Sequence, residues 1–307
     1  MTTNEPRVTA HEPAVAVSPN WLRDQYCSLL QRTLTRYEMD AEISYVQVQA
    51  LGHSIIRPTI QGLQRLLRRR QYVIMRFVTP GAVMRSEGRD WPANAETMVG
   101  MKRLDNLREC LEQVFADRVP GDVLEAGVWR GGASIFMRGV LRAYGESHRQ
   151  SWVADSFAGL PETEPERYPY DKGLDLSMYD ELGVSLETVK ANFEKYGLLD
   201  ESVHFLQGWF EDTLPAAPVD RLALLRLDGD LYSSTIQTLD ALYDKVTVGG
   251  FIVVDDYAIP ACKQATHDFR QRRGIEDPIE AIDWTGVYWR KSGDEPSDVA
   301  PRSSLSG

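Results

Sequence analysis

The chain has 307 residues, of which 43% are hydrophobic and 26% charged, and its formal net charge at pH 7 is -11. This composition is typical of a globular protein with one large domain or two small ones, and the negative charge argues against a general nucleic-acid binder. The three cysteines lie far apart, and no apolar run approaches the ~20 residues that span a bilayer. Because the first residues also lack a signal-peptide pattern, we expect a cytoplasmic protein that binds neither nucleic acid nor membrane.

The first part of the chain predicts a helical cap behind a disordered end. Residues 1–19 are polar and contain three prolines, which predicts disorder. A helix capped by Asn20 is expected to run to residue 39, since apolar residues recur there at near-helical spacing. Residues 55–76 contain six arginines and no acidic residue, which favours a solvated or interface helix or else a contact with an anionic partner. Residues 96–116 predict another amphipathic helix.

From residue 121 onward, short apolar runs alternate with helical patterns. The runs are DVLEAGV, SWVADSF, SVHFLQG, LALLRLD and GFIVVDD, and the helical patterns are GASIFMRGVLRAYG, SLETVKANFEKYG and STIQTLDALYDKV. This alternation predicts an α/β fold with a doubly wound, mostly parallel sheet, in which ligands bind at the carboxyl ends of the strands. We expect four parts: a disordered 1–19, a cap or oligomerisation region 20–95, the α/β domain 96–291 and a disordered tail 292–307.

The first strand ends in a glycine-rich turn. In DVLEAGVWRGGAS, Glu125, Gly127, Gly131 and Gly132 lie between a strand and a helix, where glycines permit a tight turn and a close ligand. The spacing differs from the G-x-G-x-x-G of dinucleotide folds and from the P-loop. An acid before the first glycine, in E-x-G-x-x-x-G, is the usual first motif of S-adenosylmethionine (SAM) methyltransferases. A glycine-rich turn of some other α/β fold is the alternative.

The next two strand ends add polar and aromatic groups. Asp155 ends its strand roughly thirty residues after the glycines, where nucleotide-binding α/β folds place an acid that binds ribose. Gln207, Gly208 and Trp209 end the third strand. The indole of Trp209 could stack on adenine or pack in the core.

Two carboxylate pairs end the fourth and fifth strands. Asp228 and Asp230 follow LALLRL, and Asp255 and Asp256 follow FIVV. Because neighbouring parallel strands would bring these ends together, the carboxylates would repel one another unless a cation lies among them. Oxygen ligands favour a hard divalent ion, Mg²⁺ above all. The alternative is that Asp230 and Ser233 cap the following helix.

The same D-x-D and D-D pattern also describes haloacid-dehalogenase-type phosphatases. Those enzymes carry D-x-D on the first strand of the domain, whereas here Asp228 follows three apparent strands, and Tyr232 stands where they usually have Thr or Val. The turn at Glu125 would also have no role in a phosphatase. We therefore treat the phosphatase as the more distant alternative.

Several segments together closely resemble the macrocin O-methyltransferase family. They are WPANAETMVGMKRLDNLRECLE, DVLEAGVWRGGASIFMRGVL, VADSFAGLPE, LLRLDGDLYSSTIQTLDALYDKVTVGGFIVVDDY and PACKQA. The resemblance implies a Rossmann-like class I fold that depends on SAM and Mg²⁺ and methylates deoxysugar hydroxyls in antibiotic biosynthesis. It covers roughly residues 21–38 and 90–290. Residues 40–88 depart from the family, and their Arg-rich stretch looks like an insertion or an altered cap.

The resemblance also implies roles for matching residues. It assigns SAM binding to Thr97, Met98, Gly100, Glu125, Gly127, Gly131, Gly132, Asp155, Ser156, Gln207, Gly208 and Trp209. It assigns the metal to Asp228, Asp255 and Asp256, and it makes Asp230 the general base.

The expected substrate is a small glycosylated acceptor. A catechol or another vicinal diol is the nearest alternative, and a SAM-binding scaffold is a third. The long loop 158–180 is predicted to cover the acceptor, with Tyr168, Tyr170 and Tyr179 as contacts, or else to be a mobile surface loop. His204 is expected to pack rather than to catalyse. The N-terminal helices favour a homo-oligomer.

Overall fold

The computed structural model of the chain describes residues 18–38, 44–47, 63, 75–79, 81–177 and 179–293. The expected disordered ends therefore lie outside the described residues, apart from Ser18, Pro19, Ser292 and Gly293. Most of the Arg-rich stretch 57–76 lies outside them as well. In the described part of the chain, no helix is long and apolar enough to cross a membrane.

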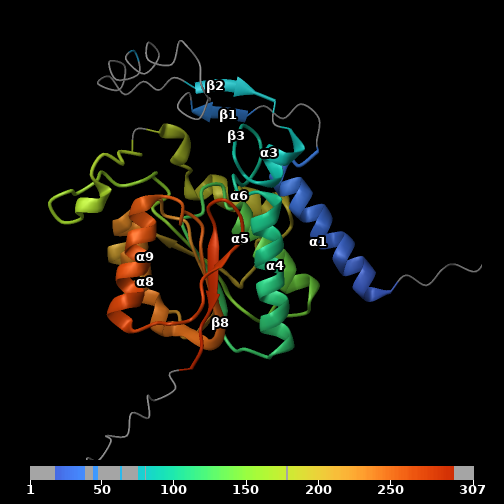
Figure 1. Cartoon of the computed structure of the whole chain (residues 1–307). Coiled ribbons are helices and arrows are strands. Elements are labelled where there is room, and N and C mark those ends of the chain that lie inside the picture. Colours follow the sequence, from blue (N-terminus) through green and yellow to red (C-terminus); the bar gives the residue numbers. More distant parts are fainter. Residues whose placement is uncertain are drawn as a thin grey trace, which may run out of the picture.

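A seven-stranded sheet forms the centre of the described chain (Figure 1). Its strand order is β6-β5-β4-β7-β8-β10-β9. The strands are β4 (Asp122–Ala126), β5 (Ser151–Asp155), β6 (Val203–Gln207), β7 (Leu222–Leu227), β8 (Val246–Val254), β9 (Glu280–Ala281) and β10 (Val287–Arg290). The first five are parallel to one another, and β10 is antiparallel to β8 and β9. The predicted doubly wound, mostly parallel sheet is confirmed.

Helices cover both faces of this sheet, because its parallel strands are apolar on both sides. In Figure 1, α1, α4 and α5 lie on one side of β8 and α8 and α9 on the other. The helices are α1 (Pro19–Thr35), α3 (Ala82–Ser86), α4 (Met101–Ala116), α5 (Gly132–Ala143), α6 (Leu186–Lys195), α7 (Phe210–Thr213), α8 (Tyr232–Leu242) and α9 (Pro260–Arg273). Short 3-10 helices are η2 (Pro169–Asp171), η3 (Asp180–Leu182) and η4 (Tyr243–Lys245). Leu107 and Phe136 pack in the core of the first layer, and Leu239 and Phe269 in that of the second.

The region expected to be a helical cap contains strands as well as helices. A small antiparallel sheet with the order β2-β1-β3 lies above the main sheet in Figure 1. Its strands are β1 (Ser44–Gln47), β2 (Met75–Val78) and β3 (Trp91–Pro92). The described residues of 20–95 thus form a mixed rather than an all-helical region.

Two helix starts differ from the predicted ones. Helix α1 begins at Pro19, and the hydroxyl of Ser18 accepts from the Trp21 N–H at 3.2 Å, so Ser18 and not Asn20 is the N-cap. Proline suits the first helical position, which explains the earlier start. Helix α4 begins at Met101 instead of residue 96. The carbonyl of Glu96 accepts from the Gly132 N–H at 2.9 Å, so the preceding segment is held across the start of α5 and cannot be helical.

Candidate active site

A cavity of about 410 Å³ opens at the carboxyl ends of the parallel strands. Residues from four strand ends line it, together with one residue before α4 and the long loop after β5. The predicted site residues on its wall are Met98, Gly127, Asp155, Ser156, Gly208, Trp209, Asp228 and Asp230. The strand ends therefore meet as the sequence predicted, and the cavity is our candidate active site.

The glycine turn is required by how closely β7 approaches β4. A Cβ atom on Gly127 would lie 1.7 Å from the carbonyl oxygen of Asp228, and the residue has a φ of +89°. Gly131 also has a positive φ and is the N-cap residue of α5, and a Cβ on Gly132 would lie 2.5 Å from the carbonyl oxygen of Glu96. Gly131 and Gly132 thus permit the backbone conformation and close packing behind the cavity. Of these three glycines, only Gly127 lines the cavity itself.

Glu125 points away from the cavity. Its side chain is buried and contacts Ser134 of α5 and Arg226 of β7. Burial raises the pKa of Glu125 to about 7, even though the adjacent guanidinium favours the charged form. The structure therefore gives Glu125 a supporting place below the glycine turn rather than a place on the cavity wall.

Asp155 lies on the wall and shapes the turn beside it. One of its carboxylate oxygens accepts from the Val128 N–H at 2.8 Å and the other from the Phe157 N–H at 2.8 Å. Ser156, which follows it, also lines the cavity. Burial raises the pKa of Asp155, while the two N–H groups act in the opposite direction. The predicted ribose-binding pair thus lies beside the glycine turn.

The third strand end contributes an aromatic ring. Trp209 lines the cavity with 41% of its surface exposed, and Gly208 lies next to it. The core-packing alternative for this indole is therefore wrong. Gln207 is exposed and does not line the cavity.

The segment before α4 reaches the cavity only through Met98. Thr97 is buried, and its hydroxyl accepts from the Val99 N–H at 3.0 Å. Gly100 precedes α4, and a Cβ on it would lie 2.3 Å from the carbonyl oxygen of Ser86. Gly100 is thus a packing glycine against the end of α3.

Asp228, Asp255 and Asp256 converge at the ends of β7 and β8. One ligand oxygen from each can be chosen so that all three lie within 4.8 Å of one another. Strands β7 and β8 are parallel neighbours with Leu227 opposite Val254, which explains why residues so far apart in sequence meet. Three carboxylates at this separation suit a hard divalent cation.

Two buried arginines, Arg226 and Arg103, contact acids of this cluster. Neither was predicted from the sequence. Arg226 of β7 contacts Glu125, Asp228 and Asp255, with its Nη1 2.9 Å from Asp228 Oδ2. Arg103 of α4 contacts the other oxygen of Asp255. A signal for Arg226 was present, because a charged residue interrupts the apolar run LALLRL. No local pattern identifies Arg103.

The two arginines divide the carboxylates into two groups. Burial opposes the charged form of Asp255, but the guanidiniums of Arg103 and Arg226 outweigh it and hold its pKa below the usual range. Burial and the neighbouring acids raise the pKa of Asp256 well above the usual range. Among the residues that the structure describes, Asp256 has no cationic side chain within 4 Å. The raised pKa shows that the ionised form of Asp256 lacks a compensating positive charge, which a bound cation would supply, so the donor set fits Mg²⁺.

Asp230 lies beside the cluster in a strained conformation. Its φ of +58° is uncommon for a residue other than glycine, and its N–H donates to Asp256 Oδ2 at 3.0 Å. Burial, together with the charges of Asp228 and Asp255, raises the pKa of Asp230 to about 7. Such strain is typical of functional sites, and an acid with this pKa can exchange protons near neutral pH.

The capping alternative for Asp230 and Ser233 is wrong. Helix α8 begins at Tyr232, and its first two N–H groups donate to the carboxylate of Asp171, at 2.6 Å from Tyr232 and 3.0 Å from Ser233. Asp171 is fully buried and comes from the long loop. The capping residue was missed because it lies 61 positions before the helix.

The long loop after β5 forms one wall of the cavity. The segment 159–162, Glu164 and Tyr168 line it. Tyr170 stacks on Tyr232 with ring centroids 5.3 Å apart, and Tyr179 is buried against Trp91. Of the three predicted tyrosine contacts, only Tyr168 therefore reaches the cavity.

His204 packs as predicted. Its ring stacks on Trp152 with centroids 4.5 Å apart, and its Nε2 lies 2.6 Å from the side-chain oxygen of Gln150. His204 belongs to β6, and these contacts hold its ring against β5 and the residue before it; it does not line the cavity.

Comparison with known proteins identifies the family of the chain. The macrocin O-methyltransferase (TylF) family profile matches residues 23–291. The chain is 56% identical over 223 residues to 8-demethyl-8-(2,3-dimethoxy-alpha-L-rhamnosyl)-tetracenomycin-C 4'-O-methyltransferase of Streptomyces olivaceus, covering 72% of this chain and 85% of that one. It is 54% identical over 211 residues to mycinamicin III 3''-O-methyltransferase of Micromonospora griseorubida, covering 68% and 83%.

Two solved structures resemble the chain as well. The O-methyltransferase NovP has a TM-score of 0.74 and 44% identity, covering 88% of this chain and 100% of that one. The calicheamicin methyltransferase CalS11, at 18% identity and a TM-score of 0.51, covers 94% of this chain and 99% of its own, and it shares the fold. The phosphatase and scaffold alternatives are thereby excluded. The chain belongs to the macrocin O-methyltransferase family and is a SAM-dependent O-methyltransferase.

Proposed function

We propose that this enzyme methylates a hydroxyl of a sugar carried by a natural product, in a Mg²⁺-dependent reaction of antibiotic biosynthesis. The observation that carries the proposal is the group of three converging carboxylates next to Asp230, of which Asp228 lines the cavity together with Asp230. The relatives support the acceptor class, because their names describe methylation of a rhamnosyl-tetracenomycin and of a mycinamicin.

Asp228, Asp255 and Asp256 would hold the Mg²⁺. When bound, Mg²⁺ would lower the pKa of a ligated hydroxyl by stabilising its anion. The side chain of Asp228 is 27% exposed, whereas that of Asp255 is 5% exposed. Asp228 therefore presents the cluster to the cavity, and Asp255 anchors it from behind.

Asp230 would act as the general base. Its carboxylate lines the cavity beside Asp228, and burial raises its pKa to about 7. Bound Mg²⁺ would offset the charges of Asp228 and Asp255 and keep Asp230 ionised, so that its carboxylate can accept a proton at neutral pH. The proton of the acceptor hydroxyl would therefore pass to Asp230, while SAM would supply the methyl group and leave as S-adenosylhomocysteine.

The glycine turn and the next two strand ends would orient SAM. Gly127 and Asp155 lie on the wall near the carboxylates, and Trp209 lies on the same wall at the end of β6. The backbone N–H groups of Val128 and Phe157 fix the Asp155 carboxylate, so its position costs little reorganisation when ligand binds. This preorganised wall would hold SAM and acceptor in line, which supplies much of the rate.

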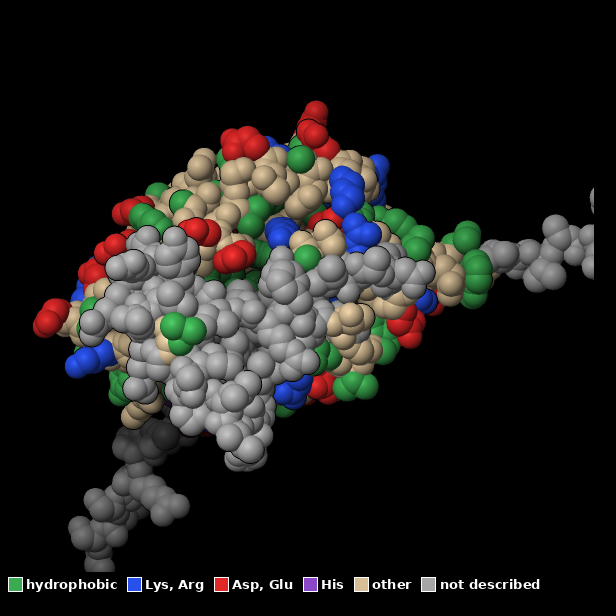
Figure 2. Space-filling view, turned by 90° about the horizontal axis from the view of Figure 1, so that it is seen from above, with side chains coloured by type: hydrophobic (Ala, Val, Ile, Leu, Met, Phe, Trp, Pro, Cys, Tyr) green, Lys and Arg blue, Asp and Glu red, His purple; other side chains and the backbone are tan. Residues whose placement is uncertain are grey.

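The loop between β5 and α6 would close the cavity against water. Asp171 ties it to the first turn of α8, directly after the segment that carries Asp228 and Asp230. In Figure 2, which looks down on the molecule from above, acidic side chains gather along the left and upper rim of the described surface. Glu162, Glu164 and Glu211 line the cavity itself, which disfavours a polyanionic acceptor.

The test is a methyl-transfer assay with SAM and a panel of desmethyl glycosides, with products identified by mass spectrometry and NMR. We expect methylation of a sugar hydroxyl, loss of activity after exhaustive EDTA treatment and recovery with Mg²⁺. A simple catechol serves as the comparison acceptor, because the same metal chemistry suits any vicinal diol. Methylation of the catechol but of no glycoside would reject the sugar assignment, and full activity in EDTA would reject the metal.

We also propose a homo-oligomer in the cytoplasm. Trp21, Leu22 and Leu29 of α1 are 52%, 55% and 64% exposed, a set of apolar side chains that a second copy would cover. The free, buried thiols of Cys27, Cys110 and Cys262 suit a reducing compartment. Light scattering on the purified protein tests the oligomer, and a monomer at working concentrations would reject it.

A further inference from the structure

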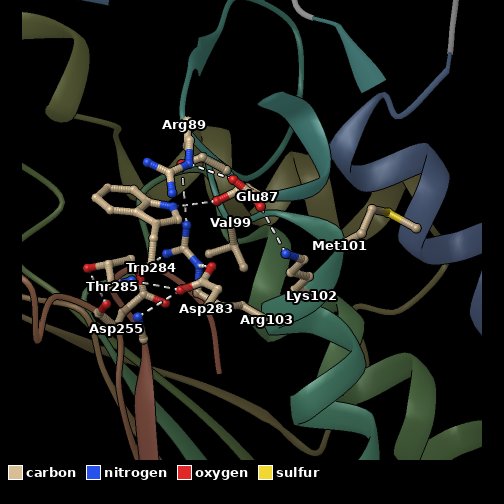
Figure 3. Close-up of polar contacts among 12 residues, drawn as sticks. Glu87, Arg89, Val99, Met101, Lys102, Arg103, Asp255, Asp283, Trp284 and Thr285 are labelled. Carbon is tan, nitrogen blue, oxygen red and sulfur yellow. Dashed lines mark hydrogen bonds and ion pairs between the residues drawn. The ribbon is translucent and has the colours of Figure 1, made fainter. Parts of the chain in front are cut away.

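A turn at the end of α3 is fastened to a turn before β10 (Figure 3). The indole N–H of Trp284 donates to the carbonyl oxygen of Glu87 at 2.7 Å, and the Arg89 guanidinium lies 4.7 Å from the Trp284 ring. The Glu87 carboxylate accepts from Arg89 at 2.6 Å and from Lys102 at 2.9 Å. We call residues 81–92 the cap segment. It is therefore docked on the methyltransferase fold by directional contacts.

The cap segment also presses against the first turn of α4. Gly88 has a φ of +58°, and a Cβ on it would lie 2.4 Å from Arg103 Nη2 and 2.6 Å from the Gly100 nitrogen. Only glycine permits this approach. The turn at Gly88 is thus held at atomic contact with the guanidinium of Arg103.

Arg103 connects this turn to the carboxylate cluster. Its guanidinium contacts Asp255, donates through Nε to Asp283 Oδ2 at 3.0 Å and through Nη2 to the Gly88 carbonyl at 3.4 Å. The hydroxyl of Thr285 donates to the backbone carbonyl of Asp255 at 3.0 Å. The side chains of Arg103, Asp255 and Asp283 are 7%, 5% and 1% exposed, so little water competes for these contacts. Asp255 is therefore held at its side chain and its backbone by groups from the same junction.

The cap segment has a second contact with the cavity. Arg85, which is buried and paired with Asp90 at 3.1 Å, donates to the Met98 carbonyl at 2.7 Å, and Met98 lines the cavity. One docked segment thus supports the wall on the cofactor side and the anchoring carboxylate on the metal side.

We propose that Arg103 is a positioning residue that couples docking of the cap segment to the orientation of Asp255, so that cap docking and Mg²⁺ binding strengthen each other. The inference rests on the proposed metal site. Each carboxylate oxygen has two lone pairs, so Asp255 can accept from an arginine and still ligate a cation. The planar guanidinium fixes Asp255, Asp283 and Gly88 in one geometry, which an ammonium on a flexible stem cannot do. Coupling between two binding equilibria is reciprocal, so each side can be measured from the other.

Hydrogen exchange of the full chain, with and without saturating Mg²⁺, tests the first direction. In the wild type, we expect Mg²⁺ to slow amide exchange in residues 81–92 by about fivefold or more. Arg103→Lys keeps the positive charge but loses the planar guanidinium with its several donors. Mg²⁺ should therefore still bind, but it should no longer slow amide exchange in residues 81–92. Arg108→Lys is the matched control, because Arg108 lies on the same helix and pairs with Asp24 and Glu112 instead. It should retain the slowing.

Trp284→Ala tests the reverse direction without touching the cluster. Trp284 is 46% exposed, so its truncation should leave the fold intact. By isothermal titration with Mg²⁺ alone, we expect this variant to bind about fivefold more weakly than the wild type. In the Arg103→Lys background the same substitution should change Mg²⁺ affinity by less than about twofold, because the connection is already broken.

Two negative outcomes separate the two proposals. A wild type that binds Mg²⁺ while exchange in 81–92 stays unchanged would overturn the coupling and leave the metal site standing. A wild type that binds no Mg²⁺ at millimolar concentration, and that methylates its acceptor in EDTA, would overturn the metal site and the coupling with it.

Discussion

Different interactions hold the two halves of the candidate active site in place: backbone contacts in one half and charged side chains in the other. The turn after β4 and the end of β5 depend on backbone geometry, since Gly127 meets the Asp228 carbonyl and two N–H groups fix Asp155. The ends of β7 and β8 depend on charged side chains, with Arg226 and Arg103 on one side of the cluster. Side-chain substitutions should therefore cost more at the carboxylate cluster than on the cofactor wall, where Gly127 and Asp155 depend on backbone contacts.

The largest effect is expected from Asp228→Asn. This change removes a charge from the proposed metal site and should lower kcat by a factor on the order of 10³. SAM affinity, measured by calorimetry, should stay within about twofold of wild type, since SAM would contact the other half of the cavity. The control is Asp220→Asn, an exposed residue 87% accessible at its side chain. If SAM affinity fell as much as kcat, the carboxylate cluster would also be needed for SAM binding, and the two halves would not act independently.

A smaller but specific loss is expected from Asp230→Asn. Without a proton acceptor, kcat should fall by a factor on the order of 10². Binding of SAM and Mg²⁺ should persist, because the backbone N–H of residue 230 still reaches Asp256. Wild-type turnover by this variant would remove Asp230 from the mechanism.

On the cofactor wall, Trp209→Ala should raise the Kd for SAM by about tenfold, the size of a lost base–aromatic stack. The kcat at saturating SAM should change little, since the indole lies apart from the carboxylates. Val248→Ala provides the comparison, because Val248 is also an exposed apolar residue but lies near the start of β8, at the opposite end of the strand from the carboxylates. An unchanged Kd would place the adenine elsewhere.

Asp171→Asn tests how the loop is tied to the carboxylate half. An amide can accept only one of the two α8 N–H groups and opposes the other, which costs about 1 kcal/mol. Cleavage by a protease within residues 158–183 should become ~5-fold faster, because the loop opens more often. Asp175→Asn, an exposed substitution in the same loop, should leave the cleavage rate unchanged. Equal cleavage rates in the wild type and both variants would show that Asp171 does not hold the loop on α8.

The ionisation of Asp230 should also make the free energy of unfolding depend on pH. Because burial raises its folded-state pKa to about 7, the folded protein holds this proton more tightly than the unfolded chain does. Stability from this group is therefore present at low pH and is lost as the pH rises from about 4 to about 7. In EDTA at pH 8, Asp230→Asn should raise Tm by on the order of 5 °C, and the difference should shrink toward pH 4. A constant difference across this pH range would contradict the shifted pKa.

Much of the candidate site was predictable because its signals are local. The apolar runs identified the strands, and each run ends in the residues that line or support the cavity. The resemblance to the macrocin O-methyltransferase family then added roles to those strand ends. Residues such as Gly100, Gly131 and Glu125 were attributed to the cofactor because they belong to the right motifs. Their contacts with α3, α6 and Arg226 depend on packing that no motif records.

The sequence by itself determined the alternating strands and helices, the glycine turn and the placing of acids at strand ends, since these follow from short-range patterns of polarity and backbone freedom. The tertiary structure alone decided which charges meet. Arg103 contacts an acid 152 positions away, Arg226 one 101 positions away, and Asp171 caps a helix 61 positions further on. The physical reason is that a buried charge is stabilised by whichever partner the fold brings within hydrogen-bond distance, and chain separation does not enter that interaction.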